Sequence, residues 1–281
     1  MTPDQYCQEK AVQSGSSFYY SFLYLPLEKR RAITALYAFC REVDDVVDEC
    51  TDVSVARTKL AWWRQEVDAI FNDGQGNKPS HPVAKALADV SSTFNLTAQR
   101  LKEIIDGMEM DLNYNRYADF ETLRHYCYHV ASVVGLCSAE IFGYRNPKTL
   151  RYAEDLGLAF QLTNIIRDVG EDACRDRIYL PQDDLARFGV TSEDILNSRE
   201  TDGFRQLMEF QIERAEGYYA RAFAALPAED RKNQRPGIIM AGIYEALLKE
   251  IKADGCHVLR QRVRLTPVRK LWIAWTTWMR G

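Results

Sequence analysis

The stretch from Phe160 to Pro181, FQLTNIIRDVGEDACRDRIYLP, lies near the middle of the chain and decides its fold. The pattern predicts the last turns of a helix that runs into an ordered loop. Polar side chains recur at spacings of three, four and four and so share one helix face: Gln161, Asn164, Asp168 and Asp172. The adjacent face is apolar and is expected to pack into a core: Leu158, Leu162, Ile165 and Val169.

This polar stripe needs an explanation, because Asn and Asp are poor helix formers in the middle of a helix. A solvated surface would be sufficient if the stripe stood alone, but residues 36–49, LYAFCREVDDVVDE, repeat the pattern. There the polar side chains are spaced by four, three and four: Tyr37, Arg41, Asp44 and Asp48. An apolar stripe again lies beside them: Leu36, Cys40, Val43 and Val47.

Each helix therefore carries two aspartates four residues apart on one face. Like charges at this spacing disfavour a helix by a few tenths of a kcal/mol, and partial burial makes the cost much larger unless cations lie between them. Mg²⁺ takes oxygen ligands, keeps several waters and favours sites that substrate phosphates complete. The two pairs together predict a site for a Mg²⁺–diphosphate cluster.

The composition excludes several other classes of protein. The chain has 281 residues, is 46% hydrophobic and carries a net charge of -4, which permits a large core and argues against general nucleic-acid binding. Seven cysteines without a C-x-x-C pair indicate free thiols in a reducing, cytoplasmic compartment. Four histidines form no H-E-x-x-H or E-x-x-H, which gives a zinc hydrolase or a di-iron bundle little support. Neither a signal peptide nor a membrane-spanning run is recognisable.

Helical patterns extend over most of the chain, and no convincing alternation with a period of two interrupts them. We therefore predict an all-α protein with a single domain over residues 1–281. The predicted helices cover residues 3–14, 27–50, 54–71, 83–93, 97–113, 119–143, 148–173, 192–198, 202–225 and 228–259.

Three further segments leave alternatives open. The Ser-rich residues 14–26, SGSSFYYSFLYLP, offer hydroxyls and backbone N–H groups to an anion, or they cap a helix over aromatic core residues. In the helix at 119–143, small side chains admit either another backbone or a flat hydrocarbon chain. That side of the helix consists of Tyr126, Val130, Ala131, Val134 and Gly135.

The third segment is the C-terminal tail, which contains no acidic residue after Asp254. Its basic residues are Arg260, Arg262, Arg264, Arg269, Lys270 and Arg280, and they are interspersed with Trp272, Trp275 and Trp278. One interpretation is a helix that lies on an anionic membrane, which would place a cytoplasmic protein peripherally on the inner membrane. The alternative is that the tryptophans pack on the domain and Arg262 or Arg264 reaches a substrate diphosphate.

At these motifs the chain resembles the squalene/phytoene synthase family over nearly its whole length. The segments YAFCREVDDVVDE and FQLTNIIRDVGEDACRDRIYLP are similar to the two Asp-rich signatures of that family. Together with SGSSFYYSFLYLP, they most resemble the bacterial hopanoid-pathway presqualene diphosphate synthases. The resemblance implies an all-α isoprenoid synthase bundle around a central cavity. It also implies that the enzyme joins two farnesyl diphosphates head to head with the help of Mg²⁺, and we expect three Mg²⁺ ions.

The resemblance also assigns roles to individual residues. The metal ligands would be Asp44, Asp48, Asn164, Asp168 and Asp172. The catalytic set would comprise these four aspartates with Arg41 and Tyr37. The substrate-binding set would be Ser17, Phe18, Phe22, Arg41, Tyr126, Val130, Ala131, Gln161, Asn164, Arg167, Arg177, Tyr179, Tyr244 and Arg262.

Other reactions remain open at this stage. DDVVD also fits head-to-tail prenyl synthases and terpene cyclases, but the second signature lacks the residues that those enzymes need. Phytoene and dehydrosqualene synthases share both signatures, and a full squalene synthase would also need NADPH, which we do not expect. Downstream isoprenoid enzymes are a further class of partner that these reactions allow. The non-enzymatic alternative is a helical interaction protein whose acidic faces are solvated.

Overall fold

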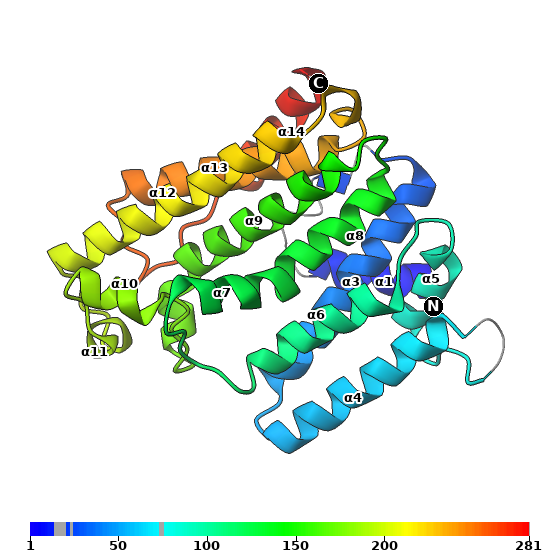
Figure 1. The fold of residues 1–281 in the computed structure, drawn as a ribbon, viewed down its shortest axis with the longest axis horizontal. Coiled ribbons are helices and arrows are strands. Elements are labelled where there is room, and N and C mark those ends of the chain that lie inside the picture. Colours follow the sequence, from blue (N-terminus) through cyan, green and yellow to red (C-terminus); the bar gives the residue numbers. More distant parts are fainter. Residues whose placement is uncertain (14–20, 23–24, 73–75, 281) are drawn as a thin grey trace.

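The computed structural model describes residues 1–13, 21–22, 25–72 and 76–280, and these residues contain helices but no β-strand. Residues Arg116 and Ile178 form an isolated parallel bridge. The helices are α1 (Pro3–Gln13), α3 (Leu27–Glu49), α4 (Val53–Ile70), α5 (Pro82–Ser91), α6 (Ala98–Met110), α7 (Phe120–Cys127), η1 (Tyr128–Ser132), α8 (Val133–Phe142), α9 (Lys148–Ala173), α10 (Gln182–Arg187), α11 (Ser192–Leu196), α12 (Asp202–Ala225), η2 (Ala228–Asp230), α13 (Arg235–Ala253) and α14 (Pro267–Arg280) (Figure 1). The all-α prediction is confirmed.

The predicted helices at 148–173 and 202–225 coincide with α9 and α12. The helix predicted at 228–259, with Pro236 starting or kinking a segment of it, is wrong as a continuous helix, although α13 does begin beside Pro236. In its place η2 precedes α13, which ends at Ala253. The next residues stop the helix because Gly255 and Cys256 adopt φ angles of +76° and +62°. The Cys256 N–H then donates to the Ile251 carbonyl at 2.9 Å, which closes the end of the helix.

The helix predicted at 119–143 is one continuous path with a π-helical turn, η1, in its middle. This turn lies against α9, and glycines on both sides of the contact let the backbones approach. A Cβ atom at Gly157 would lie 2.5 Å from the Ala131 carbonyl oxygen, and one at Gly135 would lie 2.4 Å from that of Ala153. The small residues therefore allow close helix packing, which is one of the two alternatives, and the same side of the helix also lines a cavity.

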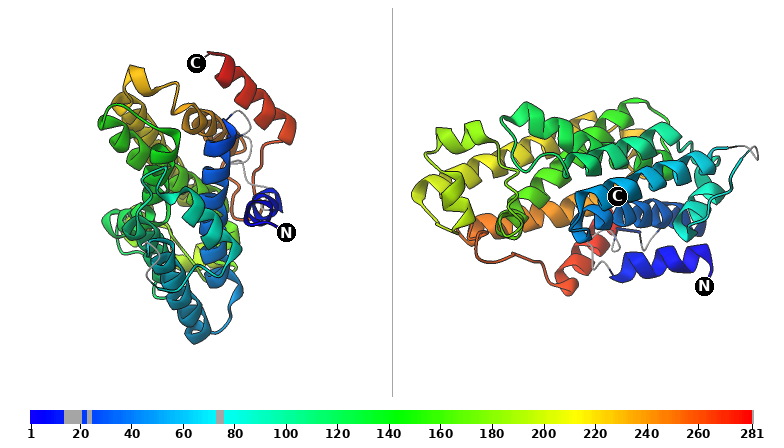
Figure 2. Two further views of the ribbon diagram at one scale, coloured as in Figure 1. Left: turned by 90° about the vertical axis from the view of Figure 1, so that its right-hand side faces the viewer. Right: turned by 90° about the horizontal axis from the view of Figure 1, so that it is seen from below.

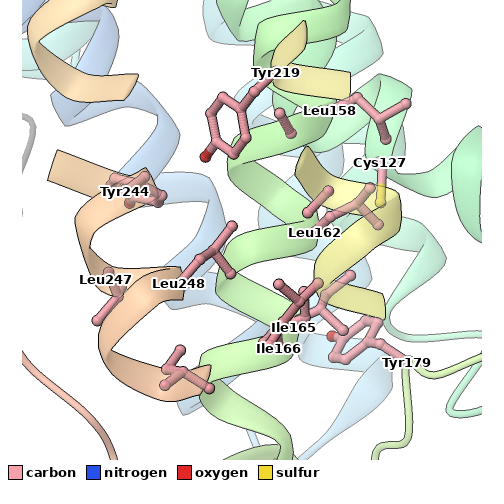
Figure 3. Close-up of a cluster of buried hydrophobic side chains, with 14 of the residues drawn as sticks. Cys127, Leu158, Leu162, Ile165, Ile166, Tyr179, Tyr219, Tyr244, Leu247 and Leu248 are labelled. Atoms are coloured by element: carbon pink, nitrogen blue, oxygen red, sulfur yellow. The ribbon is translucent and has the colours of Figure 1, made fainter. Parts of the chain in front are cut away.

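Two buried clusters make up the core of the described residues. One joins α1, α3, α4, α5, α6 and part of α8, and the other joins α7, α9, α12, α13 and the C-terminal segment. Both predicted apolar stripes are buried in them, apart from Cys40, which is half-buried. Figure 3 shows Leu158, Leu162 and Ile165 of α9 within the second cluster, between α12 and α13.

After α13, the chain crosses over α9 before it enters α14. The crossing is tight, because a Cβ atom at Gly170 would lie 2.3 Å from the Leu259 carbonyl oxygen. Helix α14 then packs on α13, where a Cβ atom at Gly242 would lie 3.3 Å from Ile273. The two views of Figure 2 place α14 and α1 on the same side of the molecule.

Candidate active site

A cavity of about 640 Å³ lies between the two clusters. Its walls come from α3, the α7–η1–α8 path, α9, α13 and the C-terminal segment. The predicted residues that line it are Phe22, Tyr37, Arg41, Asp44, Tyr126, Val130, Ala131, Gln161, Asn164, Arg167, Tyr244 and Arg262. Ser17 and Phe18 lie outside the described residues.

On α3, both predicted aspartates are held by arginines. Arg41 contacts Asp44 at 2.5 Å, and Asp48 accepts contacts of 3.0 Å from Arg175 and from Arg177. Burial raises the pKa of Asp44 to about 6, although Arg41 opposes that rise. Since Arg175 and Arg177 follow α9 in the sequence, these ion pairs connect the two predicted signatures in space.

On α9, the two aspartates differ from each other. The carboxylate of Asp168 forms ion pairs with Arg167 at 2.7 Å and with Arg262 at 2.9 Å. Within the described part of the chain, the carboxylate of Asp172 forms no ion pair or hydrogen bond. Burial and the neighbouring carboxylates of Asp168 and Asp111 raise the pKa of Asp172 to about 7.

Arg177 lies within electrostatic reach of carboxylates from three helices. Its positive charge lowers the pKa of Asp44 on α3, of Asp172 on α9 and of Asp111, which directly follows α6. Burial outweighs that effect at each of the three carboxyls. The acidic faces therefore converge, and they are not the solvated surfaces of the non-enzymatic alternative.

Asp111 was missed by sequence reasoning although it lies in the same cluster. It accepts the hydroxyl of Tyr126 at 2.8 Å and that of Tyr179 at 2.9 Å, and these two rings stack with their centroids 5.3 Å apart. Burial raises the pKa of Asp111 to about 7. The acidic DGMEMD ending of the predicted helix was the available signal, but its partners lie far along the chain.

Aromatic side chains border the charged end of the cavity. Tyr37 and Tyr244 line it, and Tyr244 shares a hydrogen bond with Arg167. The ring of Phe160 lies 5.0 Å from that of Tyr244. Arg264 and Lys270, which were not in the predicted substrate-binding set, also line the cavity and add positive charge.

The side chains predicted to bind Mg²⁺ would supply only part of its ligands. No group of three or more His, Cys, Asp or Glu side chains forms a metal cluster in the described ranges. Among the residues that the structure describes, the buried Oδ1 of Asn164 has no hydrogen-bond partner, and the amide nitrogen of Asn164 contacts Gln161 at 3.3 Å. Asn164 and Asp172 lie about 12 Å apart along α9, since each residue adds 1.5 Å. An amide oxygen of this kind suits a hard cation that also takes water and phosphate oxygens.

The other end of the cavity is apolar and closed. Tyr152 lies about 24 Å from Asp168 along α9, since each residue adds 1.5 Å. Its buried hydroxyl has no hydrogen-bond partner. Phe142 and Gln234 also line this end. Two hydrogen bonds connect the ends of helices here. Lys29 donates to the Phe142 carbonyl, and the Gln234 side chain donates to the Gly143 carbonyl.

A helical bundle that joins an acidic, arginine-lined end to an apolar cavity defines the class of the isoprenoid synthases. The chain belongs to the squalene/phytoene synthase family, because the squalene/phytoene synthase family model matches residues 11–269. It is therefore an enzyme of a prenyltransferase-type family.

Relatives and solved structures agree with this family. The chain is 37% identical to a phytoene synthase of Arthrospira platensis, over 94% of this chain and 89% of the relative. It is 35% identical to a 15-cis-phytoene synthase of Synechocystis, over 98% and 84%. A dehydrosqualene synthase structure matches with 28% identity and a TM-score of 0.86, over 98% and 95%. The structure of squalene synthase HpnC from Alicyclobacillus acidocaldarius matches with 28% identity and a TM-score of 0.77, over 90% and 94%.

Proposed function

We propose that this enzyme joins two identical prenyl diphosphates head to head, with farnesyl diphosphate as the substrate and presqualene diphosphate as the product. The observation that carries this proposal is an acidic cluster at one end of an apolar cavity. Asp44 lines the cavity, and Asp168 contacts the cavity-lining Arg262. Asp48 and Asp172 do not line the cavity, but Arg177 contacts Asp48 and lowers the pKa of Asp44 and of Asp172. A substrate with a charged head and a long hydrocarbon tail matches both ends.

The arginines would bind the diphosphate oxygens and stabilise the negative charge that develops as the allylic C–O bond breaks. Arg41, Arg167 and Arg262 line the cavity, while Arg177 lies among the carboxylates. Asp44, Asp48, Asn164, Asp168 and Asp172 would hold Mg²⁺, which would supply further charge neutralisation of the leaving group. Such preorganised electrostatic stabilisation is usually the largest catalytic contribution.

The apolar walls would position the tails and keep water away from the allylic cation, which water would trap as an alcohol. Burial of a tail contributes about 0.8 kcal/mol per CH₂ group, which is ample for positioning. Phe22, Tyr37 and Phe160 line the cavity, and an aromatic ring stabilises a nearby cation by about 0.5–2 kcal/mol. The C2=C3 bond of the second substrate attacks C1 of the cation, and loss of one proton closes a cyclopropane ring.

The 15-carbon reaction is supported by the combination of motifs and by the resemblance to dehydrosqualene synthase and squalene synthase structures. The second candidate is the 20-carbon reaction that leads to phytoene. It is favoured by relatives named phytoene synthase at 34–37% identity, so it fits the sequence comparisons at least as well. Both candidates share the same first chemical step.

Product analysis separates the candidates. The purified enzyme with Mg²⁺ is incubated with farnesyl or geranylgeranyl diphosphate, each with and without NADPH. Presqualene diphosphate from farnesyl diphosphate, unchanged by NADPH, supports the first candidate, whereas efficient use of only the 20-carbon substrate supports the second. Turnover of neither substrate contradicts the proposed function.

A further inference from the structure

The exposed face of α14 is unlike the rest of the surface. Large apolar side chains follow one another at helical spacing along it: Val268, Leu271, Trp272, Trp275 and Met279. Trp272 is 62% exposed and Trp275 is 43% exposed, and their rings contact each other at a centroid distance of 5.3 Å. The opposite face holds the helix in place, because Ala274 is fully buried and Ile273 and Thr277 lie against Gly242 of α13.

The structure bears on both alternatives for the tail, and contact with a membrane stays a prediction. Arg262 reaches Asp168 and the cavity, as one interpretation predicted. Trp272 and Trp275 do not pack on the domain, as the other interpretation required. Among the described residues, no helix combines the length and the apolar character needed to cross a bilayer.

The charge around α14 is one-sided, although the whole chain is acidic. Residues 255–281 contain six arginines or lysines and no Asp or Glu. Arg264 and Arg269 are exposed next to and on α14, and they contact Glu171 and Glu250, respectively. Arg260 is exposed farther along the segment, where it donates to the Ser198 carbonyl. An apolar helix face with tryptophans and flanking cations has the composition of helices that lie in the plane of an anionic bilayer surface.

We propose that α14 docks on an anionic lipid bilayer through Trp272, Trp275 and the apolar residues beside them. The same segment also forms part of the cavity wall, through Val263, Arg264, Leu265 and Lys270. Docking therefore places the cavity next to the bilayer, where apolar isoprenoid chains dissolve. This last step depends on the proposed function, whereas lipid binding itself does not.

Flotation with vesicles of equal parts phosphatidylglycerol and phosphatidylcholine, in the absence of substrate, tests the proposal. The full chain is expected to float with these vesicles and to bind phosphatidylcholine alone far less. Trp272→Ser combined with Trp275→Ser should weaken binding by about tenfold or more, because two large side chains lose their burial. Arg269→Gln, which removes an exposed cation of α14 itself, should weaken binding to the anionic vesicles by about fivefold.

The matched control is Trp62→Ser. Trp62 is 39% exposed on α4, at the end of the molecule opposite to α14 in Figure 1, so this variant should bind vesicles as the unmodified chain does. Wild-type flotation by the double tryptophan variant would overturn the proposal. So would the absence of flotation by the unmodified chain, or a dimer that the double variant dissociates, because a second copy would then cover the face.

Turnover in detergent distinguishes failure of this proposal from failure of the proposed function. The double tryptophan variant should keep its turnover of detergent-dispersed farnesyl diphosphate, since neither tryptophan lines the cavity. Vesicle binding without any turnover by the unmodified chain would leave the docking intact and refute the synthase assignment.

Discussion

The two ends of the cavity are built by opposite rules. At the charged end, Asp48 and Asp168 each contact two arginines, so most charges already have a partner before any substrate arrives. At the closed end, the walls are mainly apolar, and the Tyr152 hydroxyl has no partner. Removal of a charge should therefore affect turnover, whereas a change at the closed end should affect stability.

The largest expected effect is that of Asp168→Ala. This substitution removes the carboxylate that Arg167 and Arg262 hold and should lower turnover by about a thousandfold or more. Steady-state kinetics with a thermal melt by circular dichroism checks this, and the melting temperature should change little. Asp202→Ala, which removes an exposed carboxylate in contact with Arg205 at the start of α12, is the control and should keep normal turnover. Normal turnover by Asp168→Ala would contradict a catalytic role for the charged end of the cavity.

Asp111→Asn should have the next largest effect. Asp111 is a positioning residue, because it accepts the hydroxyl of the cavity-lining Tyr126. We expect kcat to fall by about 10–100-fold with a much smaller change in KM, since hydrogen bonds to charged groups contribute about 1.5–3 kcal/mol. Asp106→Asn, in an exposed ion pair with Arg64, should leave both constants unchanged. Equal changes in the two variants would show that Asp111 is only structural.

The pH dependence of Mg²⁺ binding provides a third test. Asp44 and Asp172 have folded-state pKa values of about 6 and about 7, above the ordinary value of 3.8. Between about pH 4 and 7 the folded, metal-free protein holds protons that the unfolded chain has lost, so its stability falls as the pH rises through this window. Mg²⁺ needs the ionised carboxylates, so its affinity should rise over the same range.

Calorimetric titration with Mg²⁺ and inorganic diphosphate at several pH values measures this effect. Proton release on binding should increase as the pH falls from about 8 to about 5, where both carboxyls are protonated in the metal-free protein, and it should be smaller in Asp172→Asn. Control titrations of Mg²⁺ into diphosphate alone remove the proton release of the anion itself. Equal proton release by the unmodified chain and the variant would contradict the assignment of Asp172.

The smallest effect is expected at the closed end of the cavity. Tyr152→Phe removes a buried hydroxyl without a partner, which should raise the free energy of unfolding by about 1 kcal/mol. Chemical denaturation measures the change, and turnover should remain close to normal. A loss of stability would show that the hydroxyl has a partner in solution, such as a bound water.

Periodicity predicted the parts of the fold that depend on local pattern. The polar and apolar stripes of residues 148–173 were sufficient to define α9, because burial on one face follows the helical repeat directly. The π-helical turn Tyr128–Ser132 was not predicted, because its composition does not differ from that of an ordinary helix. The end of α13 was missed although Asp254–Gly255 is a recognisable stop signal.

The resemblance predicted most residues of the site. It did not predict the residues whose place in the site depends on contacts between distant parts of the chain. Asp111 lies alone at the end of a predicted helix, and its partners Tyr126 and Tyr179 follow 15 and 68 residues later. The ion pair of Arg262 with Asp168 spans 94 residues and was not predicted, although the composition of the tail offered Arg262 or Arg264 as a ligand of a substrate diphosphate. No local pattern encodes such contacts, since they depend on how the helices pack.

The close crossing of the C-terminal segment over α9 requires that residue 170 has no side chain. Any larger side chain there would collide with the Leu259 carbonyl and lift the C-terminal segment from α9. Arg262 lies three residues beyond Leu259, so the same displacement would separate its guanidinium from Asp168. A substitution that touches neither a charge nor the cavity wall would thus be expected to loosen both catalysis and the attachment of α14.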